Sequence, residues 1–231
     1  MQKEILKIGE VDIEITFKPI KNLHLSVHPP AGRVTISSPE FYDLEKVKIY
    51  AATKWNWIKK EQFKIANQAR EPERKFITQE SHFLLGERYL LKVVNSKTNK
   101  VEKKPHKLLL NVVDKDNIDL KRKILYQFYR KELQLRLNSY IAQYADIIGL
   151  TIPKYGIRTM KTKWGSCAIR TQRLWFNIEL AKKPIECIEY IVVHELVHLL
   201  ENNHNKNFVI LMNKYLPNWR VQKKILNELP L

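Results

Sequence analysis

Cysteines and long apolar runs are both scarce in this chain. Only Cys167 and Cys187 occur among its 231 residues, whereas a small secreted scaffold normally carries more cysteines for disulfide bonds. No run of about 18 apolar residues is present, so we expect no transmembrane helix. The first residues lack the apolar stretch and the small-residue cleavage site of a secretory signal. We therefore expect a cytoplasmic protein.

Acidic residues are few relative to basic ones. The chain has 41 Lys and Arg against 24 Asp and Glu, which gives a formal net charge of +17 at pH 7. Such an excess either keeps a Lys-rich protein soluble or attracts a polyanion, of which nucleic acid is the obvious one. The total charge does not separate these interpretations, so its distribution along the chain matters.

Alternation of apolar and polar residues predicts strands in the N-terminal half. A turn at Pro29–Gly32 and an end at Pro39 divide this pattern, and a helix with Asp43 as its N-cap is expected to follow. The Lys-rich stretch 95–107 is expected to be an exposed loop. The expected elements are strands at 11–17, 23–27 and 34–36, a helix over about 43–68, a hairpin over 83–91 turning near Gly86, and a strand at 108–113.

The C-terminal half is predicted to be mainly helical. One long helix over 119–148 should end at Gly149, which suits a C-terminal cap. The later expected elements are short strands at 156–160 and 174–177, a helix from Pro184 to about Glu201, and helices near 205–215 and 217–227. No internal repeat is evident in the sequence. The fold class is therefore α+β, with a strand-rich region at 1–118, a second region at 119–231, and a soft boundary between them.

The pattern H-E-x-x-H lies within the helix expected from Pro184. His194 and His198 are four residues apart, so both imidazoles project from one helical face and can bind one Zn²⁺. In this arrangement, typical of metalloproteases, Glu195 acts on water and does not bind the metal. The alternative is a pair of core histidines satisfied by hydrogen bonds, with Glu195 in a salt bridge. The apolar run Ile188–Val193 before the motif favours the metal, because buried polar side chains need a partner.

A catalytic zinc ion needs a third protein ligand and an open position. His204 is the preferred third ligand, because it follows His198 by the spacing of H-E-x-x-H-x-x-G-x-x-H sites, and Asn202-Asn203 can turn the chain back. Glu201 stands at the position of that motif's glycine and is the alternative ligand. With three good ligands and not four, the site favours catalysis by one zinc ion over a structural zinc in a nucleic-acid-binding module.

Several segments around this motif together resemble the YgjP-like family of predicted metal-dependent hydrolases. That family is similar in its core to the SprT-type metallopeptidases, and the resemblance is strong over about 155–220. The segments that carry it are 160–167 (MKTKWGSC), 174–177 (LWFN), 190–199 (YIVVHELVHL) and 203–204 (NH). The family pattern differs at Asn205, where a small hydroxyl residue is more usual, and at Val209, where an aromatic is common.

The resemblance implies a zincin-like core, made of a small sheet and the helix of the active site. It implies that His194, His198 and His204 bind zinc and that Glu195 is the catalytic base of a peptidase. It also implies that Trp164, Gly165, Ser166 and Cys167 form part of the sheet beside the cleft. An extended peptide substrate could add to the edge of that sheet there. Alternatively, Trp164 and Cys167 simply pack in the core, or the zinc hydrolyses an amide or ester in a small molecule.

Basic residues gather in the span 154–183, where Glu179 is the only acid. If the strands of this span flank the cleft, the rim of the site is positive, and the substrate is acidic or held on nucleic acid. A solvated basic face is the alternative. The residues of this predicted basic rim are Lys154, Arg158, Lys161, Lys163, Arg170, Arg173, Lys182 and Lys183.

Overall fold

The computed structural model describes residues 3–28, 31–67 and 74–229. Its contacts divide the chain into two units, Met1–Arg70 and Glu71–Leu231, and each unit has an apolar core of its own. The predicted boundary near residue 118 does not coincide with this division. The reason is that the strands before residue 118 share one core with the long helix that follows them.

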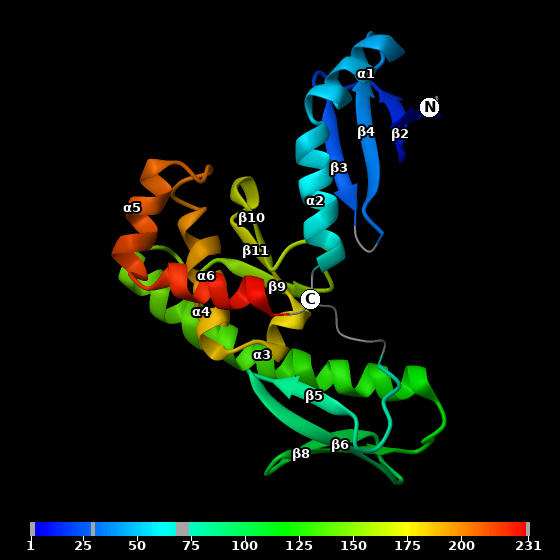
Figure 1. Ribbon diagram of the computed structural model, residues 1–231. Coiled ribbons are helices and arrows are strands. Elements are labelled where there is room, and N and C mark those ends of the chain that lie inside the picture. Colours follow the sequence, from blue (N-terminus) through cyan, green and yellow to red (C-terminus); the bar gives the residue numbers. More distant parts are fainter. Residues whose placement is uncertain (1–2, 29–30, 68–73, 230–231) are drawn as a thin grey trace. The chain divides into compact units, whose positions relative to one another are not determined.

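The first unit is a four-stranded sheet covered by two helices (Figure 1). The strand order is β1-β2-β4-β3, in which β2 and β4 are parallel and both outer pairs are antiparallel. Alternate residues of β2 and β4 are buried, and Val47, Ala51 and Ile58 from the helices complete the core. The elements are β1 (Lys3–Ile8), β2 (Val11–Lys18), β3 (His24–His28), β4 (Arg33–Pro39), α1 (Leu44–Thr53) and α2 (Trp55–Asn67).

The helix expected over 43–68 is interrupted. Asp43 does cap its start, where the side chain accepts a hydrogen bond from the backbone N–H of Lys46 at 2.8 Å. At Lys54 the backbone leaves the helical region, with φ −98° and ψ 6°, so α1 and α2 are separate helices. Residue 68 and part of the expected turn, residues 29–30, lie outside the described residues.

The second unit begins with another four-stranded sheet, in the order β5-β6-β8-β7. The stretch 95–107 is not an exposed loop as predicted, because it contains β7, which pairs with β8 at the sheet edge. The charged side chains of an edge strand face water, so β7 carries little apolar pattern. The elements are β5 (Ser81–Leu84), β6 (Glu87–Asn95), β7 (Lys100–Lys104), β8 (Lys107–Val112) and α3 (Ile118–Ile148).

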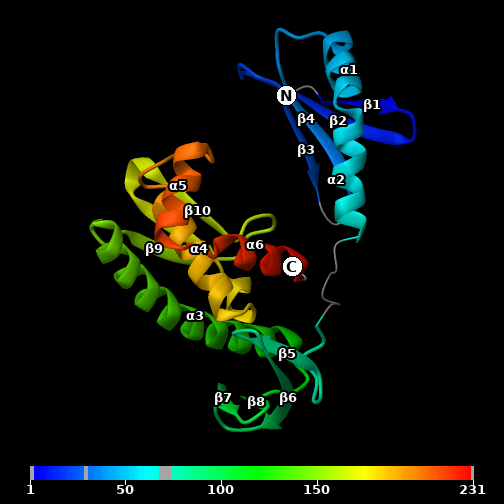
Figure 2. The same cartoon turned by 60° about the vertical axis from the view of Figure 1, so that its left-hand side comes forward.

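The rest of the second unit carries the sequence motif. A three-stranded sheet, in the order β10-β11-β9, is followed by α4, which packs against α3, α6 and β10 (Figure 2). Gly149 ends α3 in the left-handed conformation with φ 80°, as predicted. The elements are β9 (Lys154–Arg158), β10 (Gly165–Ala168), β11 (Arg173–Asn177), α4 (Ile185–Val197), α5 (Lys206–Tyr215) and α6 (Trp219–Glu228).

The expected α+β fold class is confirmed by this mixture of small sheets and helices. The α4 helix ends at Val197, earlier than the expected Glu201, and short turns continue the chain. Within the described ranges, no helix is both long enough and apolar enough to cross a membrane.

Candidate metal centre

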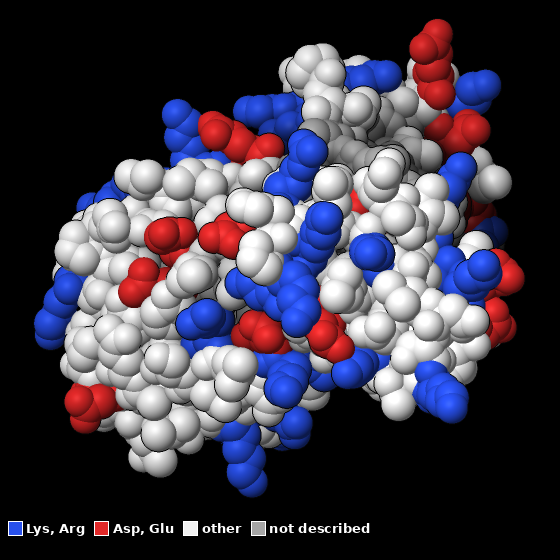
Figure 3. Space-filling model, turned by 90° about the horizontal axis from the view of Figure 1, so that it is seen from below, with Lys and Arg blue, Asp and Glu red and all other residues white. Residues whose placement is uncertain are grey.

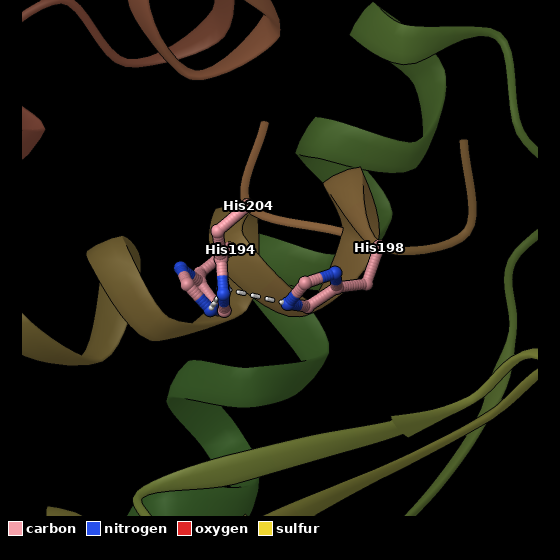
Figure 4. A group of neighbouring side chains, drawn as sticks. All are labelled: His194, His198 and His204. Atoms are coloured by element: carbon pink, nitrogen blue, oxygen red, sulfur yellow. Dashed lines mark hydrogen bonds between the residues drawn. The ribbon is translucent and has the colours of Figure 1, made fainter. Parts of the chain in front are cut away.

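Three histidine side chains converge at the end of α4 (Figure 4). His194 lies in the last turn of α4, His198 is its C-cap residue, and His204 comes from the chain beyond it. The Nε2 atom of His204 lies 3.0 Å from that of His194 and 3.1 Å from that of His198. Glu201, the alternative ligand, points elsewhere: its carboxylate accepts a hydrogen bond from the Asn203 N–H.

The protonation of these rings suits metal binding. The His198 Nδ1 atom lies 3.1 Å from the Glu201 carbonyl oxygen. That oxygen can only accept, so Nδ1 carries the proton and Nε2 presents a lone pair. Burial, reinforced by the neighbouring histidines, lowers the pKa of His194 to about 3. Burial and His198 also lower the pKa of His204. Neutral imidazoles are the form that binds a metal ion.

The spacing of the three nitrogens fits one small cation. Ligands about 2.0–2.1 Å from a tetrahedral Zn²⁺ lie roughly 3.3 Å from one another, close to the observed 3.0 and 3.1 Å. Without a cation, the Nε2 atom of neutral His204 carries at most one proton and can donate it to only one of the other two histidines. In the remaining contact two nitrogen lone pairs would face each other, which is repulsive. An N₃ donor set of this kind is well matched to zinc.

Phe208 of α5 supports all three imidazoles. Its ring centroid lies 5.0 Å from that of His194, 4.8 Å from His198 and 4.6 Å from His204. Asn205 caps α5 by accepting a hydrogen bond from the Phe208 N–H at 3.1 Å. Asparagine caps a helix as well as serine does, so the departure from the family pattern at Asn205 keeps this function. The role of Phe208 was not predicted, because His204 lies before α5 and only the folded chain brings the Phe208 ring against the three imidazoles.

Glu195 lies beside the histidines, facing β10. Glu195 is only 4% exposed. Burial raises the pKa of its carboxyl group to about 8, although the positive charge of Lys163 acts in the opposite direction. A Cβ atom added at Gly165 would lie 2.5 Å from Oε1 of Glu195. This separation is too short for a carbon atom, so glycine at 165 is what lets the strand approach the carboxylate.

A cavity of about 460 Å³ opens beside the histidines and Glu195. All four residues of the segment Trp164–Cys167 line it, and β10 is an edge strand of its sheet. Burial and the nearby Glu195 raise the pKa of Cys167 to about 11. The thiol is therefore protonated at neutral pH, which argues against a nucleophile.

Tyr190 and Asn177 are two residues of this region that were not predicted. Tyr190 lies one turn before His194 on α4 and lines the cavity, and burial raises its pKa to about 12. Asn177, which is buried, donates hydrogen bonds to the carbonyl oxygens of Met160 and Lys163 at 2.9 and 2.8 Å. Its own backbone N–H bonds to the Trp164 carbonyl oxygen at 2.8 Å. Asn177 thus holds the segment that leads into β10.

The predicted basic rim is only partly exposed. Lys182 pairs with Glu179 at 2.6 Å and Lys183 is buried, so neither belongs to an open rim. Arg158 and Arg173 stack on the Trp175 ring at 4.7 and 4.5 Å. Lys163 lines the cavity, and Lys154, Lys161 and Arg170 are exposed. On the face seen in Figure 3, basic and acidic side chains are interspersed.

Comparison with known proteins agrees with the class that this site suggests, a metallopeptidase. The chain belongs to the YgjP-like family, since the family model described as the YgjP-like metallopeptidase domain matches residues 21–229. This membership makes the protein a peptidase, and hence a hydrolase, and confirms the resemblance seen in the sequence. No curated protein matches the chain.

Two solved metallopeptidase zymogens are similar to part of the chain. Abylysin of Pyrococcus abyssi is 25% identical, over 38% of this chain and 87% of its own, with a TM-score of 0.35. Jannalysin of Methanocaldococcus jannaschii is 20% identical, over 38% of this chain and 93% of its own, with a TM-score of 0.34.

Proposed function

We propose that this protein is a cytoplasmic, zinc-dependent metallopeptidase with a zincin-like core, in which Glu195 is the general base. The observation that carries the proposal is the convergence of three imidazole Nε2 atoms, 3.0 and 3.1 Å apart, next to one buried carboxylate. The fact that the chain belongs to a metallopeptidase family supports the same proposal.

His194, His198 and His204 would hold a single ion. Among the described residues, the group of potential ligands contains these three side chains and no fourth. A site with three protein ligands leaves a position for water or substrate, whereas structural zinc sites are usually closed by four. Zinc held there would lower the pKa of a water molecule and polarise the scissile carbonyl group.

Glu195 would take the proton from the attacking water and pass it to the leaving amine. For this role the carboxylate must be ionised at the start of the reaction. Its burial opposes ionisation, but a nearby cation favours the charged form. The buried carboxylate and the three histidines thus depend on each other, because the cation that the imidazoles bind also prepares the base.

The substrate would lie along β10 as an added strand. The edge of this strand would offer backbone hydrogen bonds, and the residues Trp164 to Cys167 line the cavity beside it. Tyr190 keeps its proton at neutral pH and could donate a hydrogen bond to the substrate carbonyl. Lys163 at the cavity favours peptides with acidic side chains.

Nucleic acid has less support as a partner than an acidic peptide. The burial of Lys183 and the ion pair of Lys182 remove two charges from the predicted rim. Binding of a DNA oligonucleotide that weakens steeply with salt would restore the idea.

Replacing Glu195 tests the proposed function. Glu195→Gln should retain one zinc ion per chain in metal analysis and lose peptide cleavage by at least about a hundredfold, since a general base contributes 10²–10⁴-fold. Glu201→Gln is the matched control, because this carboxylate lies outside the group of potential metal ligands and accepts a hydrogen bond from the Asn203 N–H. His204→Ala should lower the zinc content. Unchanged cleavage by Glu195→Gln would refute its role as base.

Gly165→Ala tests whether the strand and the base must meet closely. The added Cβ atom would overlap Glu195, so cleavage should fall about a hundredfold while the zinc content stays near one per chain, because a misplaced catalytic group costs rate more than metal affinity. Ala168→Gly, at the far end of the same strand, is the control for a general loss of strand stability. Equal activity of Gly165→Ala and wild type would contradict the proposed arrangement.

A further inference from the structure

The segment that connects β9 to β10 forms one wall of the cavity beside the histidines. Its residues 159–164, all of them described, belong to neither a helix nor a strand. Thr162, Lys163 and Trp164 nevertheless line the cavity, and the next residue, Gly165, lies close to Glu195. A segment outside the helices and sheets must satisfy its backbone groups with other partners. Those partners therefore decide where this wall of the cavity stands.

The side chain of Asn177 supplies partners with both ends of its amide. Its Nδ2 atom donates to the carbonyl oxygens of Met160 and Lys163, and its Oδ1 atom accepts from the N–H of Met160 at 3.4 Å and of Glu179 at 3.3 Å. An amide has two N–H donors and two acceptor lone pairs, so these four contacts satisfy it. Asn177 is 1% exposed, so water does not replace a contact that is lost.

Two further contacts fix Trp164, the last residue before β10. Its carbonyl oxygen accepts from the backbone N–H of Asn177 at 2.8 Å, and the Lys183 ammonium group lies 5.3 Å from the centroid of its ring. Asn177 and Lys183 are the residues on either side of the 3₁₀ helix Ile178–Lys182. That helix directly precedes the start of α4. The wall of the cavity and the helix of the metal centre are thus held by the same stretch of chain.

Gly165 is the point at which the held segment meets Glu195. It is the first of the four residues of β10 and pairs with Phe176 of β11. A Cβ atom there would lie 2.5 Å from Oε1 and 2.8 Å from Cγ of Glu195, so no free space separates the strand from the carboxylate. Contacts this close transmit small displacements. A shift of the preceding segment would reach Gly165 before it reaches Ser166–Ala168, which are paired further along β11.

We propose that Asn177 is a positioning residue of the peptidase, whose amide holds segment 160–164 so that Gly165 and Glu195 keep their geometry. The proposal rests on the proposed function, because it takes Glu195 as the base. Asn177→Asp keeps the shape of the side chain but removes both N–H donors, so a carboxylate oxygen would face the Met160 and Lys163 carbonyl oxygens. The segment should then move away from its present position, while the three histidines keep theirs.

Steady-state kinetics of peptide cleavage with zinc analysis test this role. In Asn177→Asp, kcat should fall at least about tenfold, because a catalytic group misplaced by about 1 Å loses up to about a hundredfold in rate. KM should change less than about threefold, since Ser166–Ala168 stay paired with β11, and zinc should stay near one ion per chain. Asn67→Asp is the matched control. It makes the same chemical change in the first unit, where the Asn67 amide donates to the Phe63 carbonyl oxygen, and it should leave kcat unchanged.

A double-mutant cycle separates positioning from a general loss of stability. Gly165→Ala and Asn177→Asp should disturb the same contact with Glu195, so the double variant should lose less kcat than the product of the two single losses. If Asn177→Asp does not fold, Asn177→Ser takes its place. Serine is neutral and has one donor, so it cannot bond to both carbonyl oxygens, and the same fall in kcat is expected. Losses that multiply, an unchanged kcat, or a rise in KM alone would overturn the proposal.

Hydrogen exchange followed by mass spectrometry gives a readout that does not need cleavage. Exchange in residues 160–168 should be faster in Asn177→Asp than in wild type, whereas exchange in 185–197 should be the same in both. Equal exchange in 160–168 would show that Asn177 does not hold the segment. A wild type that binds zinc but cleaves no peptide would refute the proposed function, and the exchange of this segment would still decide whether Asn177 holds it.

Discussion

The two four-stranded sheets of this chain have the same topology. In residues 3–67, here called the first repeat, the order is β1-β2-β4-β3, and in residues 81–148, the second repeat, it is β5-β6-β8-β7. In both, the two central strands are parallel, the outer pairs are antiparallel, and a capped helix follows the fourth strand. The two repeats differ in the length and the contacts of the helix that follows the fourth strand.

In the first repeat the helical segment of α1 and α2 completes a small apolar core. It breaks at Lys54, and its buried residues Val47, Ala51 and Ile58 belong to the core of the first unit. In the second repeat α3 runs without a break for 31 residues and contacts both its sheet and α4. The same strand arrangement therefore has a core of its own in the first repeat, whereas in the second repeat it supports the helix that packs against α4.

The first hairpins of the repeats show the same contrast. Gly9 and Gly86 both have positive φ, of 56° and 85°. Beside Gly9 lies the Trp55 side chain, whereas beside Gly86 lies Pro184, the N-cap residue of α4. The backbone N–H of Leu85 also bonds to the Ala181 carbonyl oxygen at 2.8 Å. The second hairpin thus buttresses the start of the helix that carries His194 and Glu195.

Core substitutions should separate the two repeats most strongly. Ile15→Ala and Leu133→Ala each remove a side chain that is fully buried, so each should lower the free energy of unfolding by about 2–5 kcal/mol. Hydrogen exchange followed by mass spectrometry should locate the first loss in residues 3–67 and the second in 74–229. Only Leu133→Ala should reduce zinc binding. Loss of zinc from Ile15→Ala would show that the repeats are not independent.

Alanine at the two hairpin glycines should differ in effect. Each substitution forces an L side chain into the left-handed region, at about 1–2 kcal/mol. At Gly86 the new Cβ atom would also lie 2.9 Å from Pro184 Cα, which adds about 1–3 kcal/mol of overpacking. Denaturant unfolding should therefore show a larger loss for Gly86→Ala than for Gly9→Ala, with weaker zinc binding only in the former. Equal losses would contradict the buttress.

The helix caps should give the smallest effects, and equal ones. Asp43 accepts from the Lys46 N–H at 2.8 Å, and Asn117 accepts from the Leu120 N–H at 2.9 Å. Asp43→Ala and Asn117→Ala should each cost about 1 kcal/mol in denaturant unfolding. Asp43→Asn and Asn117→Asp, which keep a capping oxygen, should be close to neutral. A cost well above about 1 kcal/mol for only one of the two alanine variants would contradict equal roles for the caps.

Local patterns were predictable from the sequence, and pairings across the chain were not. The alternation in β2 and the caps at Asp43 and Gly149 depend on neighbouring residues, and they were expected where the structure has them. The shared topology of the repeats was not seen, because strand order depends on pairing between segments far apart. The β7 strand was missed for a related reason: its exposed charges resemble a loop until it pairs with β8.

The same distinction holds within the candidate site. His194, Glu195 and His198 lie on one helix, so their spacing alone places them together. Bringing His204 to them required the reversal of the chain after α4. Lys182 and Lys183 were counted in a basic rim, because a sequence shows charge but not the partner or the burial that neutralises its effect.

By itself, the sequence determined the elements with strong periodicity, the motif on α4 and the family of the protein. Helical spacing is a local property of the chain, so a motif with that spacing defines a face before any packing is known. The tertiary structure alone decided that Phe208 supports the three imidazoles, that Gly165 brings β10 against Glu195, and that Asn177 holds the segment that leads into β10. Each of these depends on contacts between segments that only folding brings together.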